Sequence, residues 1–221
     1  MGRFIVVEGI DKSGKSSGIE PLAAALRERG LKVAMFAFPD RSTPIGAIID
    51  DLLRGRRVVT DESLGIAEDP ERVLIATIVK QTLFSLNRLE RAEHLHALIA
   101  GHDVVISSRY ALSGIAYGMG EGVPERALRR LQGALEAGLP TPDLTLVLLV
   151  PPEVAAARAR ADDIDDLHER DALLQADVAA AYTDLAAEDP SRIVLVDGTG
   201  AVSEVLGELL TAIEDRFPDL S

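Results

Sequence analysis

The chain has 221 residues, of which 47% are hydrophobic, enough for one sizeable α/β core. Its net charge of −13 argues against a DNA- or RNA-binding protein, because a phosphate backbone needs a basic partner surface. The absence of cysteine excludes disulfides, thiolate metal sites and a cysteine nucleophile. No signal peptide or membrane-length apolar run is recognisable, so we expect a single cytoplasmic domain over residues 1–221 that binds no membrane.

The first expected elements are a strand, a glycine-rich loop and a helix. Residues 3–7 form a short β-branched run that predicts a buried strand, and residues 15–29 suit a helix. Between them, Gly9–Ser16 fits the pattern G-x-x-x-x-G-K-[ST] of a phosphate-binding loop. The backbone N–H groups of such a loop attract phosphates, Lys15 would reach the β- and γ-phosphates, and Ser16 would bind Mg2+. A chance match in a glycine-rich turn is the alternative.

A second strand is predicted over residues 32–38, and the alternation of strands and helices predicts a parallel sheet with helices on both faces. Arg41 follows this strand between two prolines, at the edge of the sheet where open α/β folds bind ligands. It could clamp a phosphate or be a surface arginine, and spacing alone does not choose. Thr43 is a candidate cap for a helix over 44–54, and residues 55–70 are expected to be a loop or lid edge.

A long helix is predicted over residues 71–100. Within it, Phe84 and Arg88 stand four residues apart and share one face. An aromatic ring one turn before an arginine could stack on a base while the arginine bonds the base edge. The competing interpretation, which periodicity alone favours, is a core phenylalanine beside a solvated arginine.

A third strand over residues 102–107 is followed by Arg109, a second arginine at a strand end. Because the carboxyl ends of parallel strands meet at one edge of a sheet, Arg109 could meet Arg41 there. Two converging arginines suit a phosphate monoester, since each can bond it bidentately. Ser113 and Tyr117 lie on one face of the helix that follows.

The rest of the chain completes the alternating pattern. We expect a glycine-rich turn over 118–123, helices over 124–137, 152–161, 171–188 and 201–217, strands over 144–150 and 192–196, and a turn over 197–200. The acidic run 162–166 does not suit a helix centre. Residues 158–170 are therefore expected to form a mobile lid that begins with Arg158.

Several motifs, in their order and spacing, together resemble the thymidylate kinase family, and most closely its eukaryotic-type branch. They are Glu8–Ser17, Phe38–Gly46, Phe84–Arg88, Arg109–Gly114 and Gly138–Asp143. The resemblance covers nearly the whole chain and implies a three-layer P-loop NTPase fold with a five-stranded parallel sheet of order 2-3-1-4-5. It also implies an enzyme that moves the γ-phosphoryl group of ATP to dTMP, giving dTDP, with Mg2+ and commonly as a homodimer.

The resemblance assigns roles residue by residue. By this resemblance, the catalytic residues would be Asp11, Lys12, Lys15, Arg109 and Arg158. The ATP contacts would be Gly9, Ile10, Asp11, Lys12, Ser13, Gly14, Lys15, Ser16, Ser17 and, near adenine, Gly198. The dTMP contacts would be Asp11, Arg41, Phe84, Arg88, Arg109, Ser113 and Tyr117. Phe84 would stack on thymine, Arg88 would bond its edge, and Tyr117 would lie beneath the deoxyribose. Ser16 would bind Mg2+, with Asp11 acting through water.

Three positions depart from the family pattern. Ser108 stands where an aspartate is usual, Gly118 where a glutamine or threonine commonly contacts the base, and Asp171 where an aromatic follows the lid. Two other functions therefore remain open: another deoxynucleotide or nucleoside kinase of the same fold, and a P-loop nucleotide-binding module without turnover. A cleft shared by Lys15, Arg41 and Arg109 would favour a kinase, whereas their separation would leave only a nucleotide binder.

Overall fold

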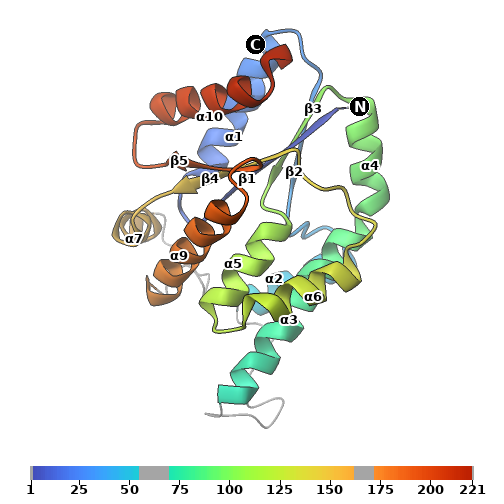
Figure 1. Cartoon of the computed structure of the whole chain (residues 1–221), viewed down its shortest axis with the longest axis vertical. Coiled ribbons are helices and arrows are strands. Elements are labelled where there is room, and N and C mark those ends of the chain that lie inside the picture. Colours follow the sequence, from blue (N-terminus) through green and yellow to red (C-terminus); the bar gives the residue numbers. More distant parts are fainter. Residues whose placement is uncertain (1, 55–69, 162–171, 221) are drawn as a thin grey trace.

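A five-stranded sheet lies at the centre of the computed structural model, which describes residues 2–54, 70–161 and 172–220 (Figure 1). Its strands are β1 (Arg3–Gly9), β2 (Val33–Ala37), β3 (Val104–Ser108), β4 (Leu144–Leu149) and β5 (Ile193–Asp197). They pair in the order β2-β3-β1-β4-β5, and every neighbouring pair is parallel. The predicted fold class and strand order are confirmed.

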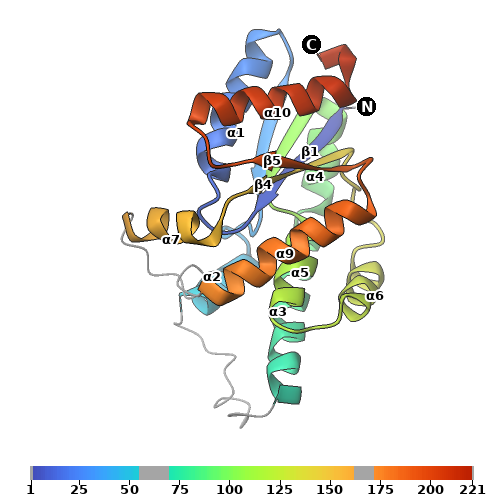
Figure 2. The ribbon, with the colours of Figure 1, turned by 60° about the vertical axis from the view of Figure 1, so that its left-hand side comes forward.

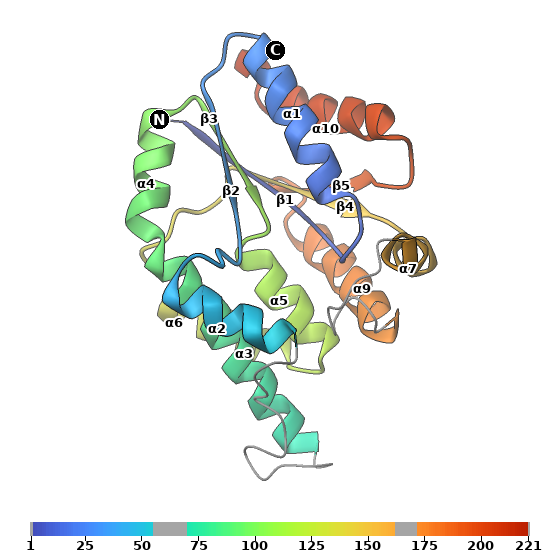
Figure 3. The same cartoon turned by 180° about the vertical axis from the view of Figure 1, so that it is seen from behind.

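Helices cover both faces of this sheet. They are α1 (Lys15–Glu28), α2 (Pro44–Leu53), α3 (Pro70–Glu90), α4 (Ala92–Gly101), α5 (Ala111–Gly120), α6 (Glu125–Leu135), α7 (Pro152–Ala161), α9 (Ala172–Glu188) and α10 (Val202–Arg216), followed by the 3-10 turn η1 (Pro218–Leu220). Figure 2 shows α1 and α10 on one face and α9 and α5 on the other, and α4 packs on the face opposite α1 and α10. Seen from behind, α2 lies across α3 beyond the ends of β2 and β3 (Figure 3).

Alternate residues of β1 serve opposite faces of the sheet. Ile5 and Val7 belong to the core cluster that includes α1 and α10, whereas Phe4 and Val6 pack with α4. All four side chains are buried. Burial on both faces explains why the strand is a continuous apolar run rather than an alternating one. The strand is thereby fixed from both sides up to Gly9, where the phosphate loop begins.

The long helix predicted over 71–100 is two helices, because Arg91 interrupts it between α3 and α4. The Arg91 side chain forms an ion pair with Asp40 at 2.7 Å, and its backbone N–H donates to the carbonyl of Arg88 at 3.1 Å. This turn redirects the chain so that Leu95 and Ile99 pack into the sheet core. A one-residue interruption leaves the hydrophobic period almost unchanged, which is why the pattern does not reveal it.

The glycine-rich turn predicted from residue 118 begins later, because α5 continues to Gly120. Gly118 lies against Leu128 of α6, and Gly120 lies against Val178 of α9. These two glycines permit close helix packing instead of a turn. Gly122, with a φ of 88°, is the residue that turns the chain.

Most of the predicted lid and lid edge falls on residues 55–69 and 162–171, which lie outside the described residues, as does Asp171. Arg158 is described and belongs to α7. Within the ranges that the structure describes, no helix is both long and apolar enough to cross a membrane.

Candidate active site

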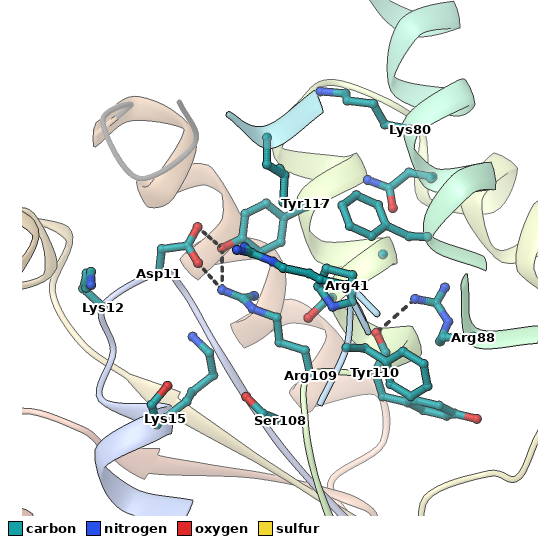
Figure 4. A pocket seen from close by; sticks show the side chains of 18 of the residues that line it. Asp11, Lys12, Lys15, Arg41, Lys80, Arg88, Ser108, Arg109, Tyr110 and Tyr117 are labelled. Carbon is teal, nitrogen blue, oxygen red and sulfur yellow. Dashed lines mark hydrogen bonds and ion pairs between the residues drawn. The ribbon is translucent and has the colours of Figure 1, made fainter. Parts of the chain in front are cut away.

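A cleft of about 680 Å³ opens beyond the carboxyl ends of β1, β2 and β3 (Figure 4). The predicted site residues that line it are Asp11, Lys12, Gly14, Lys15, Ser16, Ser17, Arg41, Phe84, Arg88, Arg109, Ser113, Tyr117 and Arg158. Its size is typical of small-molecule sites, which run from roughly 300 to 1,000 Å³. Lys15, Arg41 and Arg109 therefore share one cleft, as a kinase requires.

The phosphate loop takes a backbone shape that glycine favours. Gly9 and Gly14 have φ values of 139° and 98°. A Cβ on Gly9 would lie 2.6 Å from the carbonyl oxygen of Leu148, so a larger residue would not fit there. The Lys15 ammonium lies over the loop and donates to the carbonyls of Gly9 at 3.0 Å and Ile10 at 2.6 Å. Helix α1 starts at Lys15 with no acidic residue in its first turn, which makes this end a favourable anion site.

Arg158 connects the phosphate loop with the turn after β5. Its guanidinium donates to the carbonyl of Lys12 at 3.3 Å and to the carbonyl of Gly198 at 3.1 Å. Gly198 and Ser13 are not among the residues lining the cleft, but a Cβ on Gly198 would lie 3.1 Å from the Ser13 carbonyl. The predicted lid arginine and the predicted adenine turn therefore both lie beside the loop.

Asp11, Arg109 and Tyr117 form a cluster at the middle of the cleft (Figure 4). Arg109 Nη2 forms an ion pair with Asp11 and also donates to the Tyr117 hydroxyl at 3.2 Å. The Tyr117 hydroxyl in turn donates to Asp11 Oδ2 at 2.8 Å. Burial raises the pKa of Tyr117 far above its usual value, so this hydroxyl keeps its proton and remains a donor.

The guanidinium of Arg109 keeps its positive charge, and the backbone of this residue has an unusual conformation. Burial opposes its charge, but the facing Tyr117 and Asp11 raise the pKa of the guanidinium above its usual value. Its φ of 64° lies in the left-handed region that side chains rarely adopt. The backbone N–H of Arg109 donates to the carbonyl of Val7 at 3.0 Å, which ties this conformation to β1. Such strained positions concentrate at functional sites.

Gln175 of α9 is a site residue that the sequence did not reveal. Its side-chain oxygen accepts from the backbone N–H of Asp11 at 3.0 Å, and its amide nitrogen donates to Asp11 Oδ2 at 3.2 Å. The glutamine is buried, so both bonds are shielded from water. It follows the predicted lid by several residues, and no local pattern marks it.

Glu8 is a second residue without a predicted role. Its fully buried carboxylate accepts from the backbone N–H groups of Tyr110 at 2.8 Å and Ser113 at 3.2 Å, and from the Tyr182 hydroxyl at 2.9 Å. The Ser113 hydroxyl also donates to Glu8. Ser113 thus lines the cleft as predicted, with its hydroxyl engaged in fixing the start of α5.

Arg88 is buried, so the interpretation of a solvated arginine is wrong. Its side chain is 3% exposed and forms a bidentate ion pair with Glu136. Nε donates to Oε2 at 3.0 Å, and Nη2 donates to Oε1 at 2.5 Å. Nη2 also donates to Ser85 at 3.2 Å, and Nη1 approaches the Tyr110 carbonyl at 3.5 Å. Phe84, one turn earlier on α3, lines the same cleft. Stacking of Phe84 on a base stays a prediction.

Arg41 projects from a loop that α3 anchors. Asn87 accepts from the backbone N–H of Asp40 at 2.8 Å and donates to the Asp40 carbonyl at 3.1 Å and to Thr43 Oγ1 at 2.7 Å. The Arg41 guanidinium forms an ion pair with Asp50 of α2 at 2.9 Å and is about half exposed (47%). The loop is fixed while the end of Arg41 stays accessible from the cleft.

Two of the departures from the family pattern can be located. Ser108 lines the cleft at the end of β3. Gly118 does not line it, because a Cβ at this position would lie 2.5 Å from Cδ2 of Leu128. Position 118 of this chain therefore faces α6, and the effect of this departure on base selection stays a prediction.

The described residues contain no group of three or more histidine, cysteine, aspartate or glutamate side chains that could hold a metal ion. Ser16 and Asp11 both line the cleft beside Lys15. This small donor set fits Mg2+, which binds proteins through one or two oxygen ligands and takes the rest from phosphates and water.

Comparison with known proteins agrees with this geometry. A family model described as thymidylate kinase matches residues 7–209. The chain belongs to the thymidylate kinase family. The thymidylate kinase of Chromobacterium violaceum is 31% identical over 96% of this chain and 94% of that protein. The thymidylate kinase of Schizosaccharomyces pombe is 36% identical over 72% of this chain and 66% of that protein. The solved thymidylate kinase structure from Candida albicans has a TM-score of 0.74 at 27% identity, covering 100% of this chain and 94% of that one.

We predict that Gly46→Ala destabilises this thymidylate kinase family member through the Arg41 loop. A Cβ on Gly46 would lie 1.8 Å from the Asp40 carbonyl oxygen, so the loop must shift. Overpacking of this kind costs about 1–3 kcal/mol in the free energy of unfolding, to be measured by urea denaturation. Gly133→Ala is the control, because nothing lies within 4 Å of a Cβ there, and it should be neutral or stabilising. Equal stabilities of the two variants would contradict the prediction.

Proposed function

We propose that the chain transfers the γ-phosphoryl group of ATP to dTMP, giving dTDP. One observation carries the proposal: the phosphate loop with Lys15 shares a cleft with Arg41 and Arg109. A module that only binds a nucleotide has no need for a second set of cations facing the first. Membership of the thymidylate kinase family supports the same reaction.

The donor half of the cleft would hold the ATP phosphates through backbone N–H groups, Lys12, Lys15 and the hydroxyl of Ser16. Lys15 would exchange its present contacts with the loop carbonyls for the β- and γ-phosphate oxygens. Mg2+, bound with ATP, would add positive charge to the transferring group, with Ser16 as ligand and Asp11 contacting it through water. Arg158 would hold the loop from the adenine side.

The acceptor half would hold dTMP from both ends. The Nε and Nη1 groups of Arg109 make no hydrogen bond with the described residues, so they can grip the acceptor phosphate together with Arg41. Phe84 would stack on thymine at the other end. Tyr117 would lie beneath the sugar, where a 2′-hydroxyl would crowd its ring and deoxyribose would be favoured.

The chemistry requires position and charge more than covalent help. An oxygen of the dTMP phosphate attacks the γ-phosphorus as the bond to the bridging oxygen of ADP breaks. The chain must bring two anions into line and neutralise the charge that spreads over the transferring group. Lys12, Lys15, Arg41, Arg109 and Arg158 can do this from fixed positions. A strong general base is not needed, in keeping with a cleft lined by no histidine among the described residues.

We extend the proposal to a homodimer, which only the family resemblance supports. Light scattering on the purified chain should then give the mass of two chains. The mass of one chain would refute this part and leave the reaction untouched.

We predict that Lys15→Ala lowers turnover by about a thousandfold or more, because the charge that stabilises the transferring phosphoryl group is lost. Release of ADP at saturating ATP and dTMP measures this. Lys32→Ala is the matched control, since Lys32 is exposed and lies outside the cleft, and its rate should equal that of the parent chain. A Lys15→Ala rate within about tenfold of the parent would exclude the assigned role.

We predict that Arg41→Ala raises the KM for dTMP by about tenfold or more, the value of a lost charge-assisted hydrogen bond. The KM for ATP should change little. Arg54→Ala provides a matched control, because Arg54 pairs with the same Asp50 and is similarly exposed but does not line the cleft. If Arg41→Ala instead weakens ATP, the two halves of the cleft have been assigned the wrong way round.

A further inference from the structure

Gln81 belongs to the same face of α3 as Phe84, Ser85 and Arg88, at helical spacing. It lines the cleft and is buried, with 4% of its surface exposed. Neither periodicity nor the family resemblance gives this residue a role. A glutamine in such a position needs an explanation, because burying an amide without partners is costly.

The Gln81 side-chain oxygen has no hydrogen-bond partner among the residues that the structure describes. It lies 3.2 Å from the point where a Cβ on Gly114 would stand, and Arg88 Nη2 lies 3.4 Å from the same point. An unpaired acceptor and a guanidinium therefore lie close together against Gly114. Gln132 Nε2 lies 2.7 Å from the same point, so it is the absence of a side chain on Gly114 that lets these three groups approach α5 together.

Arg88 cannot easily turn away from this position. The Glu136 carboxylate accepts hydrogen bonds from its Nε and Nη2, Ser85 accepts from Nη2, and the Tyr110 carbonyl lies near Nη1. Arginine has five N–H donors, so one N–H of Nη1 is left for a ligand. Nη1 shares its guanidinium carbon with Nη2, the atom that lies near Gly114 and Gln81, so the fixed guanidinium holds this remaining donor on the same wall of the cleft as the Gln81 acceptor.

This pair of groups matches one class of base. Thymine and uracil carry an acceptor, O4, beside a donor, N3–H. Cytosine carries a donor, the N4 amino group, beside an acceptor, N3, so both groups are reversed. Against cytosine, the Arg88 donor would face a donor and the Gln81 acceptor would face an acceptor.

We propose that Gln81 is a specificity-determining residue whose side-chain oxygen accepts the N3–H of a 4-keto pyrimidine while Arg88 donates to O4. The inference rests on the proposed function, since it concerns the acceptor of that reaction. A site that hydrogen-bonds its substrate rejects an analogue that leaves its polar groups unpaired, and a bidentate base contact discriminates by about tenfold or more.

The test compares two acceptors that differ only at this edge, dTMP and 5-methyl-dCMP. The ratio of their kcat/KM values is measured for the parent chain and for Gln81→Leu. We expect the parent to prefer dTMP and Gln81→Leu to lower that ratio by about tenfold. Thr82→Val is the control: this partly buried neighbour of Gln81 on α3 donates to the Ile78 carbonyl and does not line the cleft, so the ratio should stay at the parent value.

Two further variants separate recognition from structure. Gln81→Glu keeps an acceptor oxygen and should retain the preference for dTMP. If thermal unfolding shows that Gln81→Leu does not fold, Gln81→Met, with a longer apolar side chain, takes its place. An unchanged ratio in the folded Leu or Met variant, or a parent chain that does not prefer dTMP over 5-methyl-dCMP, would overturn the inference. A parent chain that phosphorylates no acceptor would instead refute the proposed function.

Discussion

The ion pair between Asp11 and Arg109 joins the two halves of the cleft, and the rest of the site is arranged around it. Asp11 belongs to the phosphate loop after β1, and Arg109 follows β3, which pairs with β1 in the sheet. Tyr117 of α5 and Gln175 of α9 hold the same carboxylate from two more directions. Transfer of a phosphoryl group needs two anions at a fixed separation. Adjacent strands of one buried sheet supply that separation without relying on a flexible loop.

The cleft is lined mainly by basic side chains, although the chain as a whole carries a negative net charge. The protein carries a net charge of −13, yet the described cleft wall includes Lys12, Lys15, Arg41, Lys80, Arg88, Arg109 and Arg158 against only Asp11 and Glu121. A basic cleft in an acidic surface draws nucleotide phosphates to one place. Acidic partners then orient several of these cations, as Asp50 does for Arg41 and Glu136 does for Arg88. The acids lower the net charge while fixing the direction of each cation.

Local patterns predict the parts of this structure that local forces determine. The phosphate loop and the strands follow from a short motif and from periodicity, whereas only the family resemblance gave Lys12, Arg88 and Arg158 their roles in the cleft. Gln175 and Glu136 follow from neither source, because each acts through a contact with a distant segment: Gln175 with Asp11, and Glu136 with Arg88. The turn predicted from Gly118 begins later for a related reason. A glycine serves a turn or a close helix contact equally well, and only the position of Leu128 decides between them.

In the proposed mode of base recognition, the contacts to the base come from α3, and the glycines of α5 permit the packing that this requires. Gly118 lets Leu128 bring α6 close, and the residue that follows α6, Glu136, can then reach across to hold Arg88. Gly114, one turn earlier on α5, has no side chain to keep Gln81 and Arg88 away from this helix. A side chain at residue 114 would meet Gln132, Gln81 and Arg88 at once, the nearest at 2.7 Å. In this proposal, the hydrogen-bonding edge offered to a base is set by the packing of three helices around Gly114, and a substitution among the side chains in contact there changes what the others present.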